Sequence, residues 1–249
     1  MNGGIVDTLE GSGYEGGRVY GNAQATVRNG QVDWFLSGGG WNDKKIVGNV
    51  GVTVYDGVIN ASMGASYGAS SDHTVTGNSN NIVYGGDFSG TPREGTNGFS
   101  GGITNVGSLL GNANLTIDLR NYNREFKLPS GTSISGGVPY NGTTNLGTDA
   151  SNTITLNVYT KPGSDVLNGA AIYGDGARTS SYTKSGKIIM NIQATGSSIG
   201  NLYATNYGNA PTTGLLRDVE INLQGAKTIN GLSGGNATDS FTNTIVSKN

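Results

Sequence analysis

The stretch Ile154-Thr155-Leu156-Asn157-Val158 decides the fold class of this chain, because apolar and polar residues alternate in it one by one. An alternation with a period of two residues places the apolar side chains on one face of a β-strand. The same pattern recurs along the chain, with the apolar members Ala23-Ala25-Val27, Val50-Val52-Val54, Leu115-Ile117-Leu119, Ile188-Met190-Ile192 and Val219-Ile221-Leu223. We therefore expect each of these segments to be a strand that buries one face and exposes a polar face.

The spacing of these strands indicates a repeat with loops of variable length. Their central residues are 27 to 39 residues apart, except for an interval of 65 residues between Val52 and Ile117, which an additional unit near Ile82-Val83-Tyr84 would divide. The blades of a β-propeller must close a ring of fixed geometry, whereas the coils of a solenoid tolerate such variation. The sequence predicts an all-β chain that forms a right-handed parallel β-helix (β-solenoid) of roughly seven to eight irregular coils.

Turn residues support this fold and leave one alternative open. Glycine follows most of the alternating segments, at Gly30, Gly57, Gly163, Gly196 and Gly225. Glycine suits corners that need a positive φ angle, so we expect two or three short strands per coil and one domain over residues 1–249. Residues 70–106 alternate least and are the predicted insertion. Because Asn-Gly turns also make hairpins, an antiparallel β-sandwich is the alternative fold.

Composition excludes several kinds of partner and site. The 249 residues include 44 glycines, only 13% charged residues and no cysteine, and the net charge is −2. Nucleic-acid binding needs a basic face, so we expect no nucleic-acid partner. The absence of cysteine excludes disulfides and thiolate metal sites. No run of about 18 apolar residues occurs, so we expect no membrane insertion.

Residues that could support catalysis are sparse. The single histidine, His73, follows Asp72 in a polar stretch, and we expect it to be a solvated loop residue. Glycoside hydrolysis needs two carboxyl groups at one groove, and lyases need clustered acids with a basic residue. The candidate groups are Asp87 with Arg93 and Glu94, and Asp175 with Arg178. Neither group places two acids close together on one strand, so we interpret both as loop acids paired with arginine. We expect no catalytic residue, no metal site and no cofactor.

Aromatic residues are better candidates for binding, because flat rings stack on sugar faces and anchor protein interfaces. Trp34 lies in an apolar segment, whereas Trp41 follows three glycines in the next loop. Trp41 is therefore the predicted ligand-binding residue. Several tyrosines precede a small residue, at Tyr20, Tyr67, Tyr84, Tyr173 and Tyr203. We expect most of them to stack in a ladder along the solenoid.

The Gly/Asn-rich strands, the Tyr-Gly pairs and the corner Ile229-Asn230-Gly231-Leu232 resemble β-solenoid regions of cell-wall-anchored adhesins of Gram-positive bacteria such as streptococci. Similar sequences occur in autotransporter passengers of Gram-negative bacteria. The resemblance implies a non-catalytic, extracellular module at the cell surface that serves host attachment, cell–cell contact or biofilm formation. Its partner would be a host or bacterial surface protein or glycan, with self-association as a further prediction.

The resemblance carries over no functional residue, and two other functions stay open. The chain shows neither the signal peptide nor the wall-anchor motif of such adhesins, so we expect it to be a fragment of a longer surface protein. The first alternative is a β-helix polysaccharide lyase or glycoside hydrolase with an unrecognised carboxylate site. The second is a structural spacer without a ligand.

Overall fold

The structure is a computed structural model, and it describes most of the chain. The described ranges are 1–13, 16–41, 43–68, 72–90, 98–129, 132–137, 143–146, 152–167, 169–175, 186–204, 218–234 and 243–248. Within these ranges the regular structure consists of β-strands. No helix in them is long and apolar enough to span a bilayer.

The strands form three parallel sheets, here named sheets A, B and C, and in each sheet the strands of successive coils lie side by side. Sheet A contains β1 (Asn2–Glu10), β4 (Asn29–Ser37), β8 (Ser62–Gly64), β12 (Gly98–Ser100), β15 (Ser133–Ser135), β18 (Ala171–Tyr173), β20 (Ser198–Tyr203) and β22 (Thr228–Ser233), with β7 (Val58–Ile59) beside β4. Sheet B contains β2 (Arg18–Tyr20), β5 (Lys45–Val47), β10 (Thr74–Val75), β13 (Ile103–Leu109) and β16 (Thr143–Leu146), with β9 (Ser66–Gly68) beside β13. Sheet C contains β3 (Ala23–Val27), β6 (Val50–Val54), β11 (Ser79–Val83), β14 (Ala113–Asp118), β17 (Thr153–Tyr159), β19 (Lys187–Gln193), β21 (Asp218–Gln224) and β23 (Asn243–Lys248).

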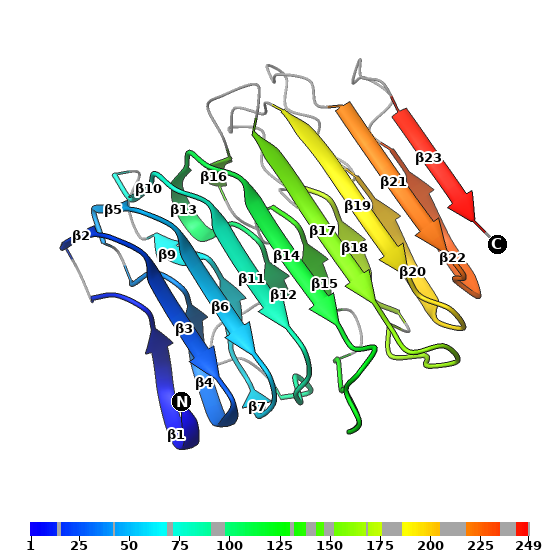
Figure 1. Ribbon diagram of the computed structural model, residues 1–249, viewed down its shortest axis with the longest axis horizontal. Coiled ribbons are helices and arrows are strands. Elements are labelled where there is room, and N and C mark those ends of the chain that lie inside the picture. Colours follow the sequence, from blue (N-terminus) through cyan, green and yellow to red (C-terminus); the bar gives the residue numbers. More distant parts are fainter. Residues whose placement is uncertain are drawn as a thin grey trace.

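The chain visits the sheets in turn, so that neighbours within one sheet are one coil apart in the sequence. The named strands pair in parallel, as β14 does with β17 over a register from Ala113↔Ile154 to Asp118↔Tyr159. The stack begins with β1 at one end and finishes with β23 at the other (Figure 1). These pairings confirm the parallel β-solenoid with up to three strands per coil and exclude the antiparallel sandwich. The described residues form about six turns, fewer than the seven to eight predicted, and the right-handed sense stays a prediction.

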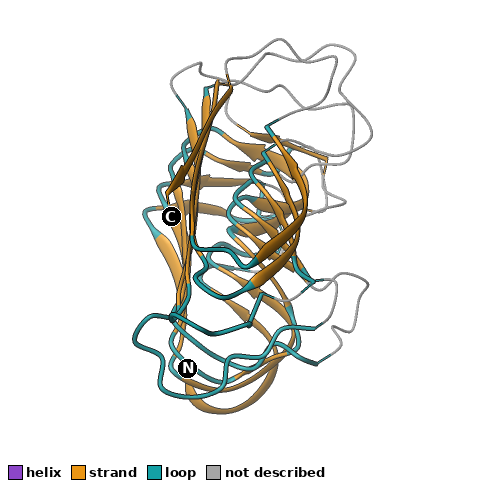
Figure 2. Cartoon of the chain, turned by 90° about the vertical axis from the view of Figure 1, so that its right-hand side faces the viewer, coloured by secondary structure: helices purple, strands orange, loops and turns teal. Residues whose placement is uncertain are grey.

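The core lies between the sheets and is filled by the alternating residues that the sequence singled out. Leu156 is fully buried, and it stacks between Leu115 of β14 and Met190 of β19, which are buried as well. All apolar members of the six predicted strands are buried. The end view shows strands on opposite sides of the coil (Figure 2). A Cβ on Gly136, next to β15 of sheet A, would lie 3.0 Å from Ile154 Cγ2 and 3.1 Å from Leu156 Cβ in β17 of sheet C, so the two sheets are packed together. The predicted facing of these strands is therefore confirmed.

Stacked glycine and asparagine residues form the corners. The predicted turn glycines have positive φ angles, for example 114° at Gly30 and 121° at Gly57. At the corner before sheet C, a Cβ on Gly77 would clash with the carbonyl of Gly48 in the coil below. The asparagine that follows each of these glycines forms a hydrogen bond to the next coil. Asn49 Oδ1, for example, accepts from the N–H of Asn78 at 2.8 Å. Equivalent bonds join Asn22 to Asn49 and Asn78 to Asn112. This asparagine ladder fixes the corner.

The prediction of an insertion over residues 70–106 is wrong for its described part. Strands β10, β11 and β12 lie within this stretch, and β13 begins in it. They continue sheets B, C and A without interruption. The pattern is hidden in β11 because the inward positions are Ser79, Asn81 and Val83. Asn81 is fully buried, accepts from the N–H of Val52 at 2.9 Å and donates to the carbonyl of Ser100 at 2.7 Å. A hydrogen-bonded amide thus takes the place of an apolar side chain in the core, in line with Val52 and Leu115 of the neighbouring strands.

The tyrosines before small residues do not form one ladder. Tyr173 of β18 and Tyr203 of β20 are paired in register in sheet A, with ring centroids 6.0 Å apart. Tyr84 instead stacks on Tyr55 beside sheet C, at 5.2 Å. Tyr67 lies in β9 beside sheet B, and Tyr20 in β2 is 75% exposed. The expected ladder is therefore limited to local pairs, because the Tyr-Gly pairs occupy different corners of the coil.

Candidate functional site

The outer face of sheet C presents polar and aromatic side chains in rows that run along the solenoid axis. The strand registers place Thr26, Thr53, Ile82, Thr116, Asn157, Asn191 and Asn222 in one line, here named the amide row. The parallel line at the strand ends consists of Arg28, Tyr55, Tyr84, Asp118, Tyr159, Gln193 and Gln224, here named the tyrosine row. Both rows result from the period of two, which turns these side chains away from the core.

Hydrogen bonds between successive coils connect the C-terminal half of the amide row. Asn222 Nδ2 donates to Asn191 Oδ1 at 2.9 Å, and Asn191 Nδ2 donates to Asn157 Oδ1 at 2.8 Å. Asn157 Nδ2 in turn donates to Thr116 Oγ1 at 3.1 Å. The amide planes are therefore held in one orientation. Each amide nitrogen carries two hydrogens, and in Asn191 only one of them serves the ladder.

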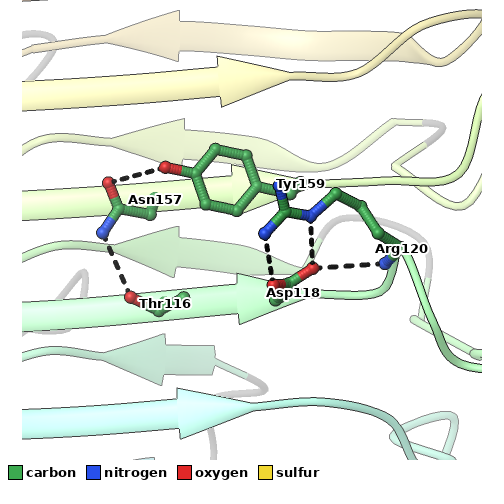
Figure 3. Close-up of polar contacts among 5 residues, drawn as sticks. All are labelled: Thr116, Asp118, Arg120, Asn157 and Tyr159. Carbon is green, nitrogen blue, oxygen red and sulfur yellow. Dashed lines mark hydrogen bonds and ion pairs between the residues drawn. The ribbon is translucent and has the colours of Figure 1, made fainter.

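Within the tyrosine row, Tyr159 lies beside Asn157, and Arg120 lies next to the Tyr159 ring (Figure 3). The Tyr159 hydroxyl donates to Asn157 Oδ1 at 3.3 Å, and the guanidinium of Arg120 lies 4.5 Å from the Tyr159 ring centre. Arg120 also binds both carboxylate oxygens of Asp118, at 2.8 and 2.6 Å. The hydrogen bonds from Arg120 lower the pKa of Asp118, so this carboxylate stays ionised and paired. Further along the row, Arg28 lies 4.8 Å from the centre of Tyr55.

Two shallow grooves hollow this face. One has a volume of about 370 Å³ and is lined by Tyr159, Asn191, Gln193, Asn222 and Gln224, among others. The second, also about 370 Å³, lies over β3, β6 and β11 and is lined mainly by asparagines, including Asn22, Asn49, Asn78, Asn80 and Asn114. Amide groups and tyrosine rings at the wall of an open groove suit hydrogen bonding to hydroxyls and stacking on sugar rings.

The predicted ligand-binding residue, Trp41, lies elsewhere, in an aromatic cluster near sheet B. Its ring stacks on Tyr67 of β9 with centroids 4.0 Å apart and planes 14° apart. Phe35 contacts both rings, at 4.8 Å from Trp41 and 4.5 Å from Tyr67, and Trp34 lies 5.2 Å from Trp41. Trp41 is half-buried, so its ring is partly engaged in packing. Its role in binding stays a prediction.

The expectation of a solvated His73 is wrong. The side chain is fully buried, and its Nδ1 contacts the backbone carbonyl of Asp43. Strand β13 lies against it, because the His73 carbonyl accepts from the N–H of Ser108 at 2.8 Å and a Cβ on Gly107 would lie 2.9 Å from the imidazole Cδ2. Burial lowers the pKa of His73, against the opposing effects of the Asp43 carbonyl and carboxylate. A polar sequence context gives no sign of such burial.

The carboxylates chosen from the sequence do not assemble a catalytic pair. Asp87 forms an ion pair with Lys127 at 3.1 Å and accepts from Ser89, whereas its predicted neighbours Arg93 and Glu94 lie outside the described residues. Asp175 is fully buried after β18, and Arg178 lies outside the described residues. Among the described residues, no group of three or more His, Cys, Asp or Glu side chains could hold a metal ion.

A charged groove of about 260 Å³ brings Asp87 near a second acid, Asp56. The loop over residues 119–129 closes this groove, since the Tyr122 hydroxyl donates to Asp56 at 2.8 Å and Arg124 forms an ion pair with it. Desolvation opposes the ionisation of Asp56 and Asp87, but hydrogen bonds and the neighbouring cations outweigh it and lower the pKa of both groups. Neither acid is kept protonated, as a general acid at neutral pH needs to be.

Sequence reasoning identified the polar faces of the strands but not their alignment into rows. The signal that could have revealed it in the N-terminal half is the Gly-Asn pair before four of these strands, at Gly21-Asn22, Gly48-Asn49, Gly77-Asn78 and Gly111-Asn112. These pairs mark the same corner in successive coils, and aligning the strands on them places Tyr55 and Tyr84 in one row. No family model, curated protein or solved structure matches this chain.

Proposed function

We propose that this chain is a non-catalytic adhesion module of a bacterial surface protein and that it binds a glycan through the outer face of sheet C. The observation that carries the proposal is the pair of rows on this face, in which hydrogen-bonded asparagines occupy three successive coils and tyrosines of the neighbouring row occupy three coils, at Tyr55, Tyr84 and Tyr159. Coils are about 4.8 Å apart, so Asn157, Asn191 and Asn222 present one amide per coil to a chain lying along the axis.

The chemistry of the rows favours sugar over a charged ligand. Asn157 and Asn191 each offer one amide hydrogen that the ladder does not use, whereas both hydrogens of Asn222 are bound, to Asn191 and Glu220. Tyr84 and Tyr159 offer ring faces. Two ion pairs neutralise charges on the C-terminal half of the face, since Arg120 binds Asp118 and Lys187 binds Glu220, both at 2.6 Å. A rigid stack of parallel strands holds these groups in place before a ligand arrives, which reduces the entropy lost on binding.

The alternative of a lyase or glycoside hydrolase receives less support from the described residues. Its best location is the groove of Asp56 and Asp87, where both acids are ionised and paired. Hydrolysis by two carboxyl groups needs one of them to carry a proton at the working pH.

The proposal is tested by a glycan array together with a panel of host surface proteins. We expect the chain to bind linear glycans and to release no reducing ends or unsaturated products from pectin, hyaluronan, dextran or chitin. The double variant Asp56→Asn, Asp87→Asn is expected to keep the binding. Product that appears with the wild type and vanishes in this variant would contradict the proposal and favour the enzyme. Binding to a host protein in the absence of glycan binding would also contradict it.

A further inference from the structure

A group of oxygen atoms converges at the N-terminal corner between sheets A and B, away from the rows on sheet C. Glu10 is the last residue of β1, and Ser12 and Gly13 follow it. Gly40 and Asp43 lie in the connection from β4 to β5. The side chain of Glu10 accepts from the backbone N–H of Trp41, so the two segments are in direct contact.

The Asp43 carboxylate is buried but only half satisfied. It is 1% exposed, and its Oδ2 accepts from Ser12 Oγ at 2.6 Å. Its Oδ1 is buried without a hydrogen-bond partner, and so is Oε1 of Glu10. Among the described residues, neither carboxylate forms an ion pair with a lysine or arginine. Leaving two buried carboxylate oxygens unpartnered is costly, because water and counter-ions no longer solvate them.

These oxygens lie close around the backbone of two glycines, Gly40 and Gly17. A Cβ built on Gly40 would lie under 3.0 Å from the Gly13 carbonyl oxygen, from Asp43 Oδ2 and from Ser12 Oγ. A Cβ on Gly17 would lie 3.2 Å from Asp43 Oδ1. The corner therefore gathers carboxylate, hydroxyl and carbonyl oxygens without a side chain between them. Oxygen donors of these kinds are the ligands of hard cations, above all Ca²⁺.

The two carboxylates of this corner are close enough to repel each other. The imidazole of His73 also contacts the corner, because its Nδ1 lies against the backbone carbonyl of Asp43.

We propose that Glu10, Ser12, Asp43 and the Gly13 carbonyl bind a hard cation of the Ca²⁺ class at this corner. The site is independent of glycan binding on sheet C. Two carboxylates supported by neutral oxygens give weaker binding than sites with more acids. Because Glu10 also holds the backbone of Trp41, the bound cation fastens the end of β1 to the loop that carries the aromatic cluster.

Terbium luminescence tests the site directly, since Tb³⁺ replaces Ca²⁺ and a tryptophan as near as Trp41 sensitises its emission. We expect saturable Tb³⁺ emission from EDTA-treated protein, competition by CaCl₂, and a higher melting temperature in CaCl₂ than in EDTA. Glu10→Gln is expected to abolish both effects, and Trp41→Phe to reduce the emission while keeping the Ca²⁺-dependent shift. Glu220→Gln is the matched control, because Glu220 is an acid in an ion pair with Lys187 on sheet C.

The variants also distinguish a loss of cation binding from a general loss of stability caused by the substitution. Glu10→Gln keeps an oxygen that can accept from the N–H of Trp41, so in EDTA this variant is expected to melt close to the wild type. Asp43→Asn keeps an acceptor for Ser12 and is expected to lose the Ca²⁺-dependent shift. Absence of saturable emission, or equal Ca²⁺-dependent shifts in wild type and Glu10→Gln, would overturn the proposal.

Discussion

At the scale of single residues, the side of the strand on which a side chain lies decides its effect on stability. Leu156 is fully buried between Leu115 and Met190, whereas Asn157 belongs to the amide row outside. We expect Leu156→Asp to cost several kcal/mol, because it buries a carboxylate without a partner. Asn157→Asp loses one donor to Thr116 but stays at the surface, and we expect a cost of about 0.5–1 kcal/mol. Urea denaturation checks both values, and equal costs would show that the facing is wrong.

His73 makes stability depend on pH in a defined direction. Its pKa is lowered in the folded chain, so the unfolded chain takes up a proton first as the pH falls below about 6.5. Stability that is present at neutral pH is therefore lost on acidification, by up to about 1.4 kcal/mol per pH unit. We expect the free energy of unfolding to fall less between pH 7.5 and 5.5 in His73→Gln than in the wild type. Parallel pH profiles of the two proteins would contradict this account.

At the scale of strands, the sequence predicts those elements whose apolar residues alternate. Six strands of sheet C, namely β3, β6, β14, β17, β19 and β21, were identified with their facing, because each buries an apolar residue at every second position. β1 was not identified, since Asn2-Gly3-Gly4 is exposed and has no such alternation. The short strands of sheet B are equally hidden, because two or three residues do not establish a period. Tertiary stacking on neighbouring coils, rather than local propensity, makes them strands.

Strand β11 allows us to test whether a buried amide can stabilise the core in the place of an apolar side chain. Asn81 forms hydrogen bonds with the N–H of Val52 and the carbonyl of Ser100. Without the amide side chain, these two buried backbone groups lose those hydrogen bonds. We expect Asn81→Ala to destabilise the chain by at least about 1–3 kcal/mol through these unsatisfied groups. Asn80→Ala changes the exposed neighbour on the outer face and is expected to cost less than about 0.5 kcal/mol. Similar thermal unfolding of the two variants would show that the buried amide has no structural role.

At the scale of the whole molecule, the proposed function depends on which residues of different coils are neighbours in space, and the sequence alone does not show this. Trp41 was selected for its glycine-rich loop, and the structure places it in a packed cluster with Phe35 and Tyr67. The rows on sheet C need the register of every coil, and loops of unequal length hide that register in the sequence. Asn157 and Asn191 are 34 residues apart but directly hydrogen-bonded, which only the stacked coil explains.

The most direct test of binding through sheet C compares two tyrosines with the same local contact. Tyr159 donates to Asn157 on sheet C, and Tyr203 donates to Asn201 on sheet A at 3.2 Å. We propose titration calorimetry of Tyr159→Ala and Tyr203→Ala with the glycan that the array identifies. The account predicts that Tyr159→Ala loses about 1–3 kcal/mol of binding free energy, while Tyr203→Ala binds as the wild type does. Equal affinity of both variants, or a loss confined to Tyr203→Ala, would contradict the assignment of sheet C as the binding face.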